Sequence, residues 1–299
     1  MKYFELAIIG ATASGKSALG VEIAKAFGGV ILSLDSLSVY KEIDIASAKP
    51  SKKERSLIPH YGIDLLYPNE YFSAIEFAKL YKKISKRLKK EKKPLIITGG
   101  SSFYLKMLLD GFSPSPKISS EIKTEVEKIL LDKKKAFEKI LKIDKNLKIA
   151  PNDQYRIKKA LEIYFATNLP PSRYFEKNPP KPIIKNLPIF EIVWEKKDLR
   201  QRVVKRTKKM FELGLIDEVA FLESKYKDRS LTSLKAIGIK EVLDYFDGVY
   251  SKEKLEEKII TNTLKLAKRQ TTFNRSQFKN IKRGSFKEIK NIILASFGK

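Results

Sequence analysis

Short apolar runs alternate with longer amphipathic stretches in the N-terminal part of the chain. Three such runs predict buried strands, at residues 4–9, 30–34 and 94–98. After the first run, Leu19, Ile23 and Phe27 are spaced four apart and predict a helix over residues 17–27. A strand, loop and helix repeated in this way is typical of an α/β fold with a parallel sheet, whose ligands bind at the carboxyl ends of the strands.

The pattern changes after Gly111, where Pro114 and Pro116 indicate a linker. Helical patterns follow up to residue 165, and the proline-rich stretch 168–182 closes them. An apolar run at 187–194 then predicts a strand that returns to the sheet, and residues 196–299 are mostly helical in pattern. We therefore expect an α/β core formed by 1–112 and 187–299, and an inserted helical lobe formed by 113–186.

The first predicted strand leads into the sequence GATASGKS, which matches the phosphate-binding pattern G-x-x-x-x-G-K-[ST]. Its members are Gly10, Ala11, Thr12, Ala13, Ser14, Gly15, Lys16 and Ser17. Such a loop turns its backbone N–H groups toward phosphate oxygens, while Lys16 adds a positive charge and Ser17 offers a hydroxyl to Mg²⁺. The pattern predicts a polyphosphate or pyrophosphate ligand and does not say which compound.

Polar residues follow the other two predicted strands. Asp35 could bind Mg²⁺ or act as a general base, or it could form an Asx turn that ends the strand. Ser101 or Ser102 is expected to cap the helix that begins after Gly99 and Gly100. Lys49 could reach a phosphate, although its own segment favours simple surface charge.

The charge is strongly positive, with 61 Lys and Arg against 35 Asp and Glu. This excess attracts polyanions such as nucleic acid, or it is a lysine-rich solvated surface. It is spread along the chain, which favours a basic face on a folded enzyme over a disordered arm. Arg202 and Arg206 share one helix face, and KRQTTFNR at 268–275 combines basic, polar and aromatic residues in a way that suits nucleic-acid contact.

Several functional classes are excluded or disfavoured. The chain has no cysteine, so disulfides and thiolate metal sites are excluded, and its single histidine, His60, is expected to be structural. Neither a signal peptide nor an apolar stretch long enough to span a membrane is present. We therefore expect a soluble cytoplasmic enzyme that does not enter a membrane.

Ten segments in order resemble the tRNA dimethylallyltransferases, also called tRNA isopentenyltransferases, over nearly the whole chain. They are GATASGKS, SLDSLSVY, ASAKP, PHYGIDL, YFSAIEFA, PLIITGGSSFYL, NDQYRIKKALEIY, GLIDEV, AIGIKE and KRQTTFNR. The resemblance implies a P-loop, kinase-like core with an inserted domain that binds the tRNA anticodon stem-loop. It implies transfer of a dimethylallyl group from dimethylallyl diphosphate to N6 of the adenosine 3′ of the anticodon in tRNA. It also implies that the enzyme requires Mg²⁺ and is a monomer.

The resemblance also implies roles for particular residues. Asp35 would accept the amine proton, Ser101 would keep the hydroxyl of the family's usual threonine, and Arg202, with Arg206 as the less certain choice, would face the pyrophosphate. Contacts with tRNA are implied for Asp35, Ser36, Leu37, Ser38, Ser101, Lys123, Tyr155, Arg156, Lys159, Lys268, Arg269, Gln270 and Arg275.

The chain departs from the family pattern at a few of these positions. Tyr155 and Lys159 stand where the family has glutamine and arginine, and Phe273 and Asn274 stand for tryptophan and leucine. These departures affect the expected tRNA contacts and leave the expected chemistry unchanged. Two alternatives stay open from the residues: an ATP-dependent P-loop nucleoside or small-molecule kinase, and an NTP-regulated RNA-binding protein without chemistry.

Overall fold

The computed structural model describes residues 2–298. Their contacts divide the chain into two compact units. The first unit combines Met1–Leu108 with Ile184–Lys299, and the second is Leu109–Ile183. The helical lobe expected at 113–186 overlaps the second unit.

The first unit is built around a six-stranded sheet in the order β3-β2-β4-β1-β5-β6, and all neighbouring strands are parallel. The strands are β1 (Glu5–Gly10), β2 (Val30–Ser33), β3 (His60–Tyr61), β4 (Leu95–Thr98), β5 (Ile189–Ile192) and β6 (Lys282–Gly284). The predicted α/β class with a parallel sheet is confirmed, while the edge strands β3 and β6 were not predicted. The pairing places Thr98 opposite both Ile8 and Ser33, so β1, β2 and β4 end at the same edge of the sheet.

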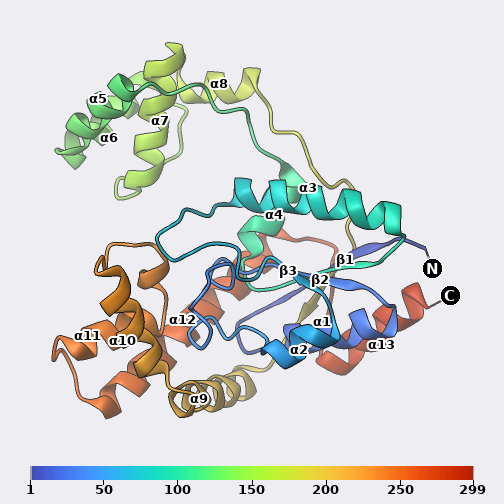
Figure 1. Cartoon of the computed structure of the whole chain (residues 1–299). Helices are drawn as coiled ribbons and strands as arrows, with labels where there is room; N and C mark the ends of the chain where they lie inside the picture. The colour runs from blue at the N-terminus through green and yellow to red at the C-terminus, as the bar shows by residue number, and fades with distance from the viewer. Residues whose placement is uncertain (1, 299) are drawn as a thin grey trace. The chain divides into compact units, whose positions relative to one another are not determined.

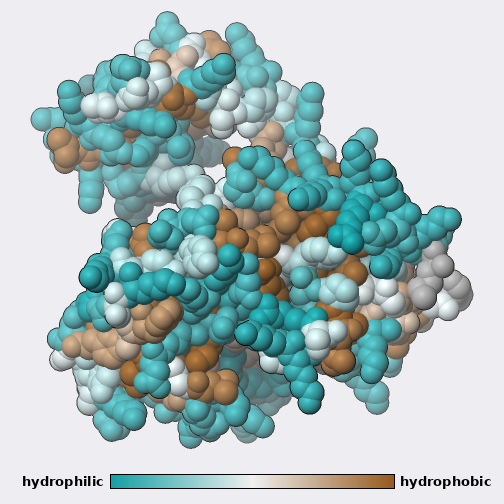
Figure 2. All heavy atoms as spheres, viewed as in Figure 1, coloured by the Kyte–Doolittle hydropathy of each residue, from teal (hydrophilic) through white to brown (hydrophobic). Residues whose placement is uncertain are grey.

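Helices cover both faces of this sheet (Figure 1). On one face, α1 (Lys16–Ala26) and α13 (Phe286–Phe297) pack against it through an apolar cluster that includes Ile23 and Ile289. On the other face lie α3 (Ala74–Glu91) and α4 (Ser102–Asp110). The face of the molecule seen in Figure 2 is mostly hydrophilic. Among residues 2–298, no helix is long and apolar enough to cross a bilayer.

The first unit contains further helical elements, most of which pack against a loop beside the edge where the strands end. They are α2 (Lys52–Leu57), α9 (Lys196–Glu212), α10 (Leu215–Tyr226), the 3₁₀ turn η1 (Ser233–Lys235), α11 (Ile239–Phe246) and α12 (Lys252–Gln277). A second apolar cluster joins Val39 and Ile43 of the loop to Leu215 and Val219 of α10 and to Ile259 of α12. This packing fixes the segment that follows β2, including the residues after Asp35.

The second unit contains α5 (Ser120–Leu130), α6 (Lys133–Ile143), α7 (Gln154–Thr167) and α8 (Pro171–Lys177). The first three share a small core that includes Val126, Ile140 and Leu161. The buried Asp144 accepts hydrogen bonds from the backbone and hydroxyl of Ser172, which ties α8 to the end of α6.

Candidate active site

The glycine-rich loop of residues 10–17 joins β1 to α1. Gly10, at φ 153°, has no room for a side chain, because an added Cβ would lie 2.8 Å from the carbonyl oxygen of Ile192. Gly15, at φ 92°, occupies the N-cap position of α1 in the left-handed region that favours glycine. Lys16 begins the helix, and its Nζ donates a hydrogen bond to the carbonyl oxygen of Ala11. Phosphate binding at such a loop uses the N–H groups at the helix start together with the lysine charge.

A cavity of about 660 Å³ lies beside this loop. Many of the residues singled out from the sequence line it: Thr12, Lys16, Ser17, Asp35, Ser36, Leu37, Ser38, Ser101, Arg206, Arg269 and Gln270. Apolar side chains complete the lining, among them Ala46, Met210, Ile259 and Leu266. The cavity can therefore hold a ligand that combines a charged end with an apolar part.

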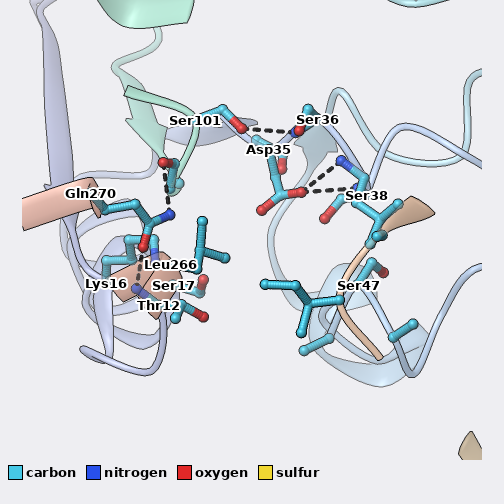
Figure 3. Close-up of a pocket in the computed structure, with 18 of the residues that line it drawn as sticks. Thr12, Lys16, Ser17, Asp35, Ser36, Ser38, Ser47, Ser101, Leu266 and Gln270 are labelled. Carbon is cyan, nitrogen blue, oxygen red and sulfur yellow. Dashed lines mark hydrogen bonds between the residues drawn. The ribbon is translucent and has the colours of Figure 1, made fainter. Parts of the chain in front are cut away.

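Asp35 faces this cavity from the segment after β2. Its Oδ1 accepts hydrogen bonds from the N–H groups of Leu37 and Ser38, at 2.8 and 3.1 Å, which is the Asx turn considered from the sequence. The turn uses only one carboxylate oxygen, so Oδ2 is left to face the cavity. In Figure 3, Asp35 and Ser38 lie across an open space from Thr12 and Lys16. The turn and an active role for the carboxylate are thus compatible.

Ser101 lies at the end of β4, beside Asp35. Its Oγ accepts a hydrogen bond from the N–H of Ser36 at 3.0 Å (Figure 3). Its own N–H donates to the carbonyl oxygen of Leu34. Gly99 permits this approach, because a Cβ there would lie 2.0 Å from the Leu34 carbonyl oxygen. Ser101 therefore links the ends of β2 and β4 and helps to orient the Asp35 turn.

The charges around the cavity shift one another. Burial, reinforced by the nearby positive charge of Arg206 and opposed by Asp35, lowers the pKa of Lys16 to about 8. Burial also lowers the pKa of Arg206, again opposed by Asp35. Two cations held side by side away from solvent form a site that favours an anionic ligand.

The two candidate arginines, Arg202 and Arg206 of α9, take different places. Arg206 lines the cavity, and its Nη1 donates to Oγ1 of Thr12 at 3.0 Å. Arg202 does not line it; it is exposed, its Nε donates to the carbonyl oxygen of Ala13 at 2.7 Å, and its guanidinium lies over the ring of Trp194. Arg202 contributes instead to a second, more open basic cavity of about 960 Å³, which shares Lys16, Ser17, Ala48 and Arg206 with the first.

Gln270 lies within the 268–275 segment and bridges two loops of the site. Its Oε1 accepts from the N–H of Thr12 at 2.8 Å, and its Nε2 donates to the carbonyl oxygen of Gly100 at 3.0 Å (Figure 3). Its neighbours Lys268, Arg269 and Arg275 are exposed, and Arg269 is the one that also lines the cavity. The substituted position Asn274 is fully buried and donates to Glu191, so this departure belongs to the protein interior.

Other predicted contacts lie on the surface of the second unit. Lys123 is exposed on α5, and Tyr155, 67% exposed, lies in the first turn of α7. Arg156 pairs with Asp153 and Lys159 pairs with Glu162, at 3.2 and 2.7 Å. Each of these ion pairs is formed between residues three apart in sequence.

Sequence reasoning was wrong about Lys49 and missed its network. The Lys49 side chain is 2% exposed, and its Nζ bonds to the carbonyl oxygen of Tyr40 and to the carboxylates of Asp44 and Asp64. It is therefore a structural ion pair of the loop after Asp35 and not a surface charge. His60, as expected, has a structural bond: Nδ1 contacts the carbonyl oxygen of Ile58 at 2.7 Å.

Comparison with known proteins bears on this site. The family model described as IPP transferase matches residues 38–277. A tRNA dimethylallyltransferase of Nautilia profundicola is 56% identical over 97% of this chain and 98% of its own length, and one of Helicobacter pylori is 46% identical over 97% and 92%.

Solved structures are also similar. The full-length tRNA isopentenylpyrophosphate transferase of Bacillus halodurans superposes with a TM-score of 0.72 at 29% identity, covering 98% of this chain and 95% of that one. A eukaryotic dimethylallyltransferase described as acting on tRNA gives a TM-score of 0.80 at 26% identity, covering 92% and 70%. Each of these proteins is named a transferase, which favours prenyl transfer over the kinase alternative.

Proposed function

The chain belongs to the IPP transferase family, and from that premise we propose that it transfers a dimethylallyl group from dimethylallyl diphosphate to a tRNA. The acceptor is N6 of the adenosine 3′ of the anticodon, and diphosphate is released. The observation that carries the proposal is the placement of Asp35 and Lys16 on the walls of one cavity that also has apolar lining. A charged diphosphate and an apolar prenyl group are the two halves of such a donor.

Asp35 is proposed as the general base. The adenine amine is a weak nucleophile because its lone pair is delocalised into the ring. As nitrogen attacks C1 of the donor, a new N–C bond forms and the C1–O bond to diphosphate breaks. The amine proton passes to Oδ2 of Asp35, since Oδ1 is engaged by the N–H groups of Leu37 and Ser38.

The leaving diphosphate is proposed to be held at the opposite wall. Lys16 and Arg206 line this part of the cavity, and Arg206 lies close enough to Lys16 to help lower its pKa. Negative charge develops on the leaving oxygen as the C1–O bond breaks, and fixed cations stabilise that charge in the transition state. Arg206 is proposed here as the arginine that faces the diphosphate, with Arg202 supporting the loop from outside.

Mg²⁺ is proposed as a partner of the diphosphate. Among the described residues, no group of three or more His, Cys, Asp or Glu could hold a metal ion, but Ser17 brings a hydroxyl to the cavity. This set fits Mg²⁺, which commonly uses one or two protein ligands together with waters and substrate phosphates. When bound, Mg²⁺ would neutralise charge on the diphosphate.

The basic surface and the second unit are proposed to bind tRNA. Lys123, Tyr155, Arg156 and Lys159 are exposed there, and the net charge of +26 suits a polyanionic partner. Transfer requires the target base to leave its stack, at a cost of a few kcal/mol. Phosphate contacts and base stacking on aromatic side chains would offset that cost.

The test is a transfer assay with labelled dimethylallyl diphosphate and unmodified tRNA. Label is expected in tRNA that has adenosine at the acceptor position and not in the same tRNA with guanosine there. A parallel reaction with ATP and no donor serves as the control for the kinase alternative. Absence of label in the adenosine tRNA, from enzyme that binds tRNA in a salt-dependent manner, would favour an RNA-binding protein without chemistry.

A further inference from the structure

Glu218 is an acidic residue of the GLIDEV segment for which the proposed chemistry has no role. It lies in the first turn of α10, and its carboxylate accepts three backbone N–H groups from a single loop. Oε2 accepts from Asp44 and Ile45, at 2.8 and 2.7 Å, and Oε1 accepts from Ala46 at 2.9 Å. Hydrogen bonds to an ionised acceptor are the stronger kind, so this contact fixes the loop firmly.

The loop that Glu218 holds forms part of the cavity wall. Ala46, Ser47 and Ala48 line the cavity together with Lys16 and Ser17. Ala48 lies at both cavities that meet at the glycine-rich loop. Glu218 itself is absent from the lining, as far as the described residues go, so it can act on a ligand only through this wall.

The wall has a backbone conformation that needs support. Glu42 and Ala48 have φ values of 67° and 49°, in the left-handed region that residues other than glycine rarely adopt. Side chains from α10 hold the loop at Glu42 and at the residues before Ala48: Glu42 is bonded by Lys225 and Tyr226, and the N–H groups of residues 44–46 are bonded by Glu218. Without the carboxylate, the three N–H groups would lose their acceptor, and the segment would keep only the anchors supplied by Lys49 and by apolar packing.

The other end of the loop is fixed independently. The Asx turn of Asp35 and the bond from Ser36 to Ser101 hold residues 35–38 without any contribution from Glu218. The two halves of the loop can therefore be perturbed separately. Residues 35–38 carry the proposed base, whereas residues 46–48 lie beside the proposed diphosphate cradle.

We propose that Glu218 is a positioning residue that sets the wall of residues 46–48 against Lys16 and Ser17, and thereby sets the affinity for the diphosphate donor. This inference rests on the proposed function, because the donor is identified there. Glu218→Gln is the informative change, since an amide keeps the size of the side chain but has one acceptor oxygen and places an NH₂ group against a backbone N–H.

The experiment measures binding of dimethylallyl diphosphate by calorimetry, without tRNA, and then steady-state kinetics with both substrates. Glu218→Gln is expected to weaken donor binding and raise the donor KM about tenfold, while kcat and the KM for tRNA stay within about twofold of wild type. Amide hydrogen exchange at residues 44–46 should become faster. Asp217→Asn is the matched control, because Asp217 is an exposed acidic residue of the same helical turn, and it should change none of these quantities.

The outcomes separate the possible failures. Unchanged donor affinity in Glu218→Gln, or an equal rise of both KM values, would overturn the positioning role. If the glutamine variant does not fold, Glu218→Asp replaces it, because aspartate keeps the charge on a shorter side chain. This variant should also weaken donor binding without changing the KM for tRNA, but to a smaller degree. Normal donor binding in Glu218→Asp would likewise overturn the positioning role. Wild-type enzyme that binds the donor but transfers nothing to tRNA would refute the proposed function and leave the donor-binding result standing.

Discussion

Predicted substrate contacts lie in both units of the chain, but their surroundings differ. In the first unit, the cavity side chains bond to distant segments: Gln270 bonds to Thr12 and to Gly100, which lie 258 and 170 positions away in sequence. In the second unit, Arg156 and Lys159 pair with carboxylates only three positions away. The first arrangement is fixed by contacts between segments far apart in sequence, whereas the second consists of local ion pairs whose cations, Arg156 and Lys159, are exposed.

This difference predicts the size of mutational effects. Groups held in place around a cavity act at full strength on a developing charge, and removing one costs several kcal/mol of transition-state stabilisation. An exposed ion pair such as Arg156–Asp153 is worth about 0–1 kcal/mol, and its arginine is free to exchange the carboxylate for a phosphate. Effects on chemistry should therefore concentrate in the first unit, and small effects on RNA affinity should concentrate in the second.

Asp35→Asn should give the largest loss. Asparagine keeps an oxygen that can accept from Leu37 and Ser38, so the turn is retained, but its side chain cannot take up the amine proton. We expect kcat to fall about 10²- to 10⁴-fold, with tRNA affinity unchanged, as measured by single-turnover transfer and by filter binding. Near-normal turnover would show that Asp35 is not the base. Asp217→Asn, at an exposed position that lines neither cavity, is the control.

Substitutions of the two candidate arginines, Arg202 and Arg206, should differ in their effect on kcat/KM by more than an order of magnitude. Arg206→Gln removes a cation from the cavity, and we expect kcat/KM for the donor to fall about 10²-fold or more. Arg202→Gln removes an exposed contact to the carbonyl oxygen of Ala13, and its effect should stay below about tenfold. Thermal unfolding is measured for both variants, because a lower Tm for Arg206→Gln would mean that its loss of kcat/KM includes a loss of folded enzyme. Equal losses in both variants would contradict the distinction drawn from the cavity.

Donor affinity should depend on pH through Lys16. The amine is protonated below its lowered pKa of about 8 and becomes neutral above it in the free enzyme. A diphosphate binds the charged form, so its dissociation constant should rise as pH increases from 8, approaching about tenfold per pH unit. Calorimetry with a non-reactive donor analogue between pH 7 and 9.5 measures this. A Lys16→Arg variant keeps its charge over the whole range, so a steep rise that persists in it would assign the titration to another group.

The fold could be predicted where hydrophobic pattern alone determines it. Strands such as β4, LIIT, are buried on both faces and stand out as apolar runs. The strands β3 and β6 have only two and three residues, of sequence HY and KRG, and carry no such signal. Pairing with their neighbours β2 and β5 defines them, and this pairing follows from the tertiary structure.

The candidate site shows the same limit. Lys16 and Asp35 could be brought together from sequence, because the ends of parallel strands share one edge. Arg202 and Arg206 could not be separated, because they lie one turn apart on the same helix face. Their different places follow from Trp194, whose ring lies under Arg202 and whose Nε1 bonds to the Ser14 carbonyl oxygen. Glu218 was missed for a similar reason: it bonds main-chain atoms more than 170 residues away.

The smallest predicted effect is that of Lys159 in the second unit. Lys159→Gln should weaken tRNA binding about two- to threefold at moderate salt, since one proposed phosphate contact is lost. The salt dependence of binding should flatten by about one unit of log–log slope. Lys158, the next residue, pairs with Glu127, so Lys158→Gln is the matched control and should leave the slope unchanged. If both variants flatten the slope equally, the second unit attracts tRNA through its overall charge. Lys159 would then not be a specific RNA contact.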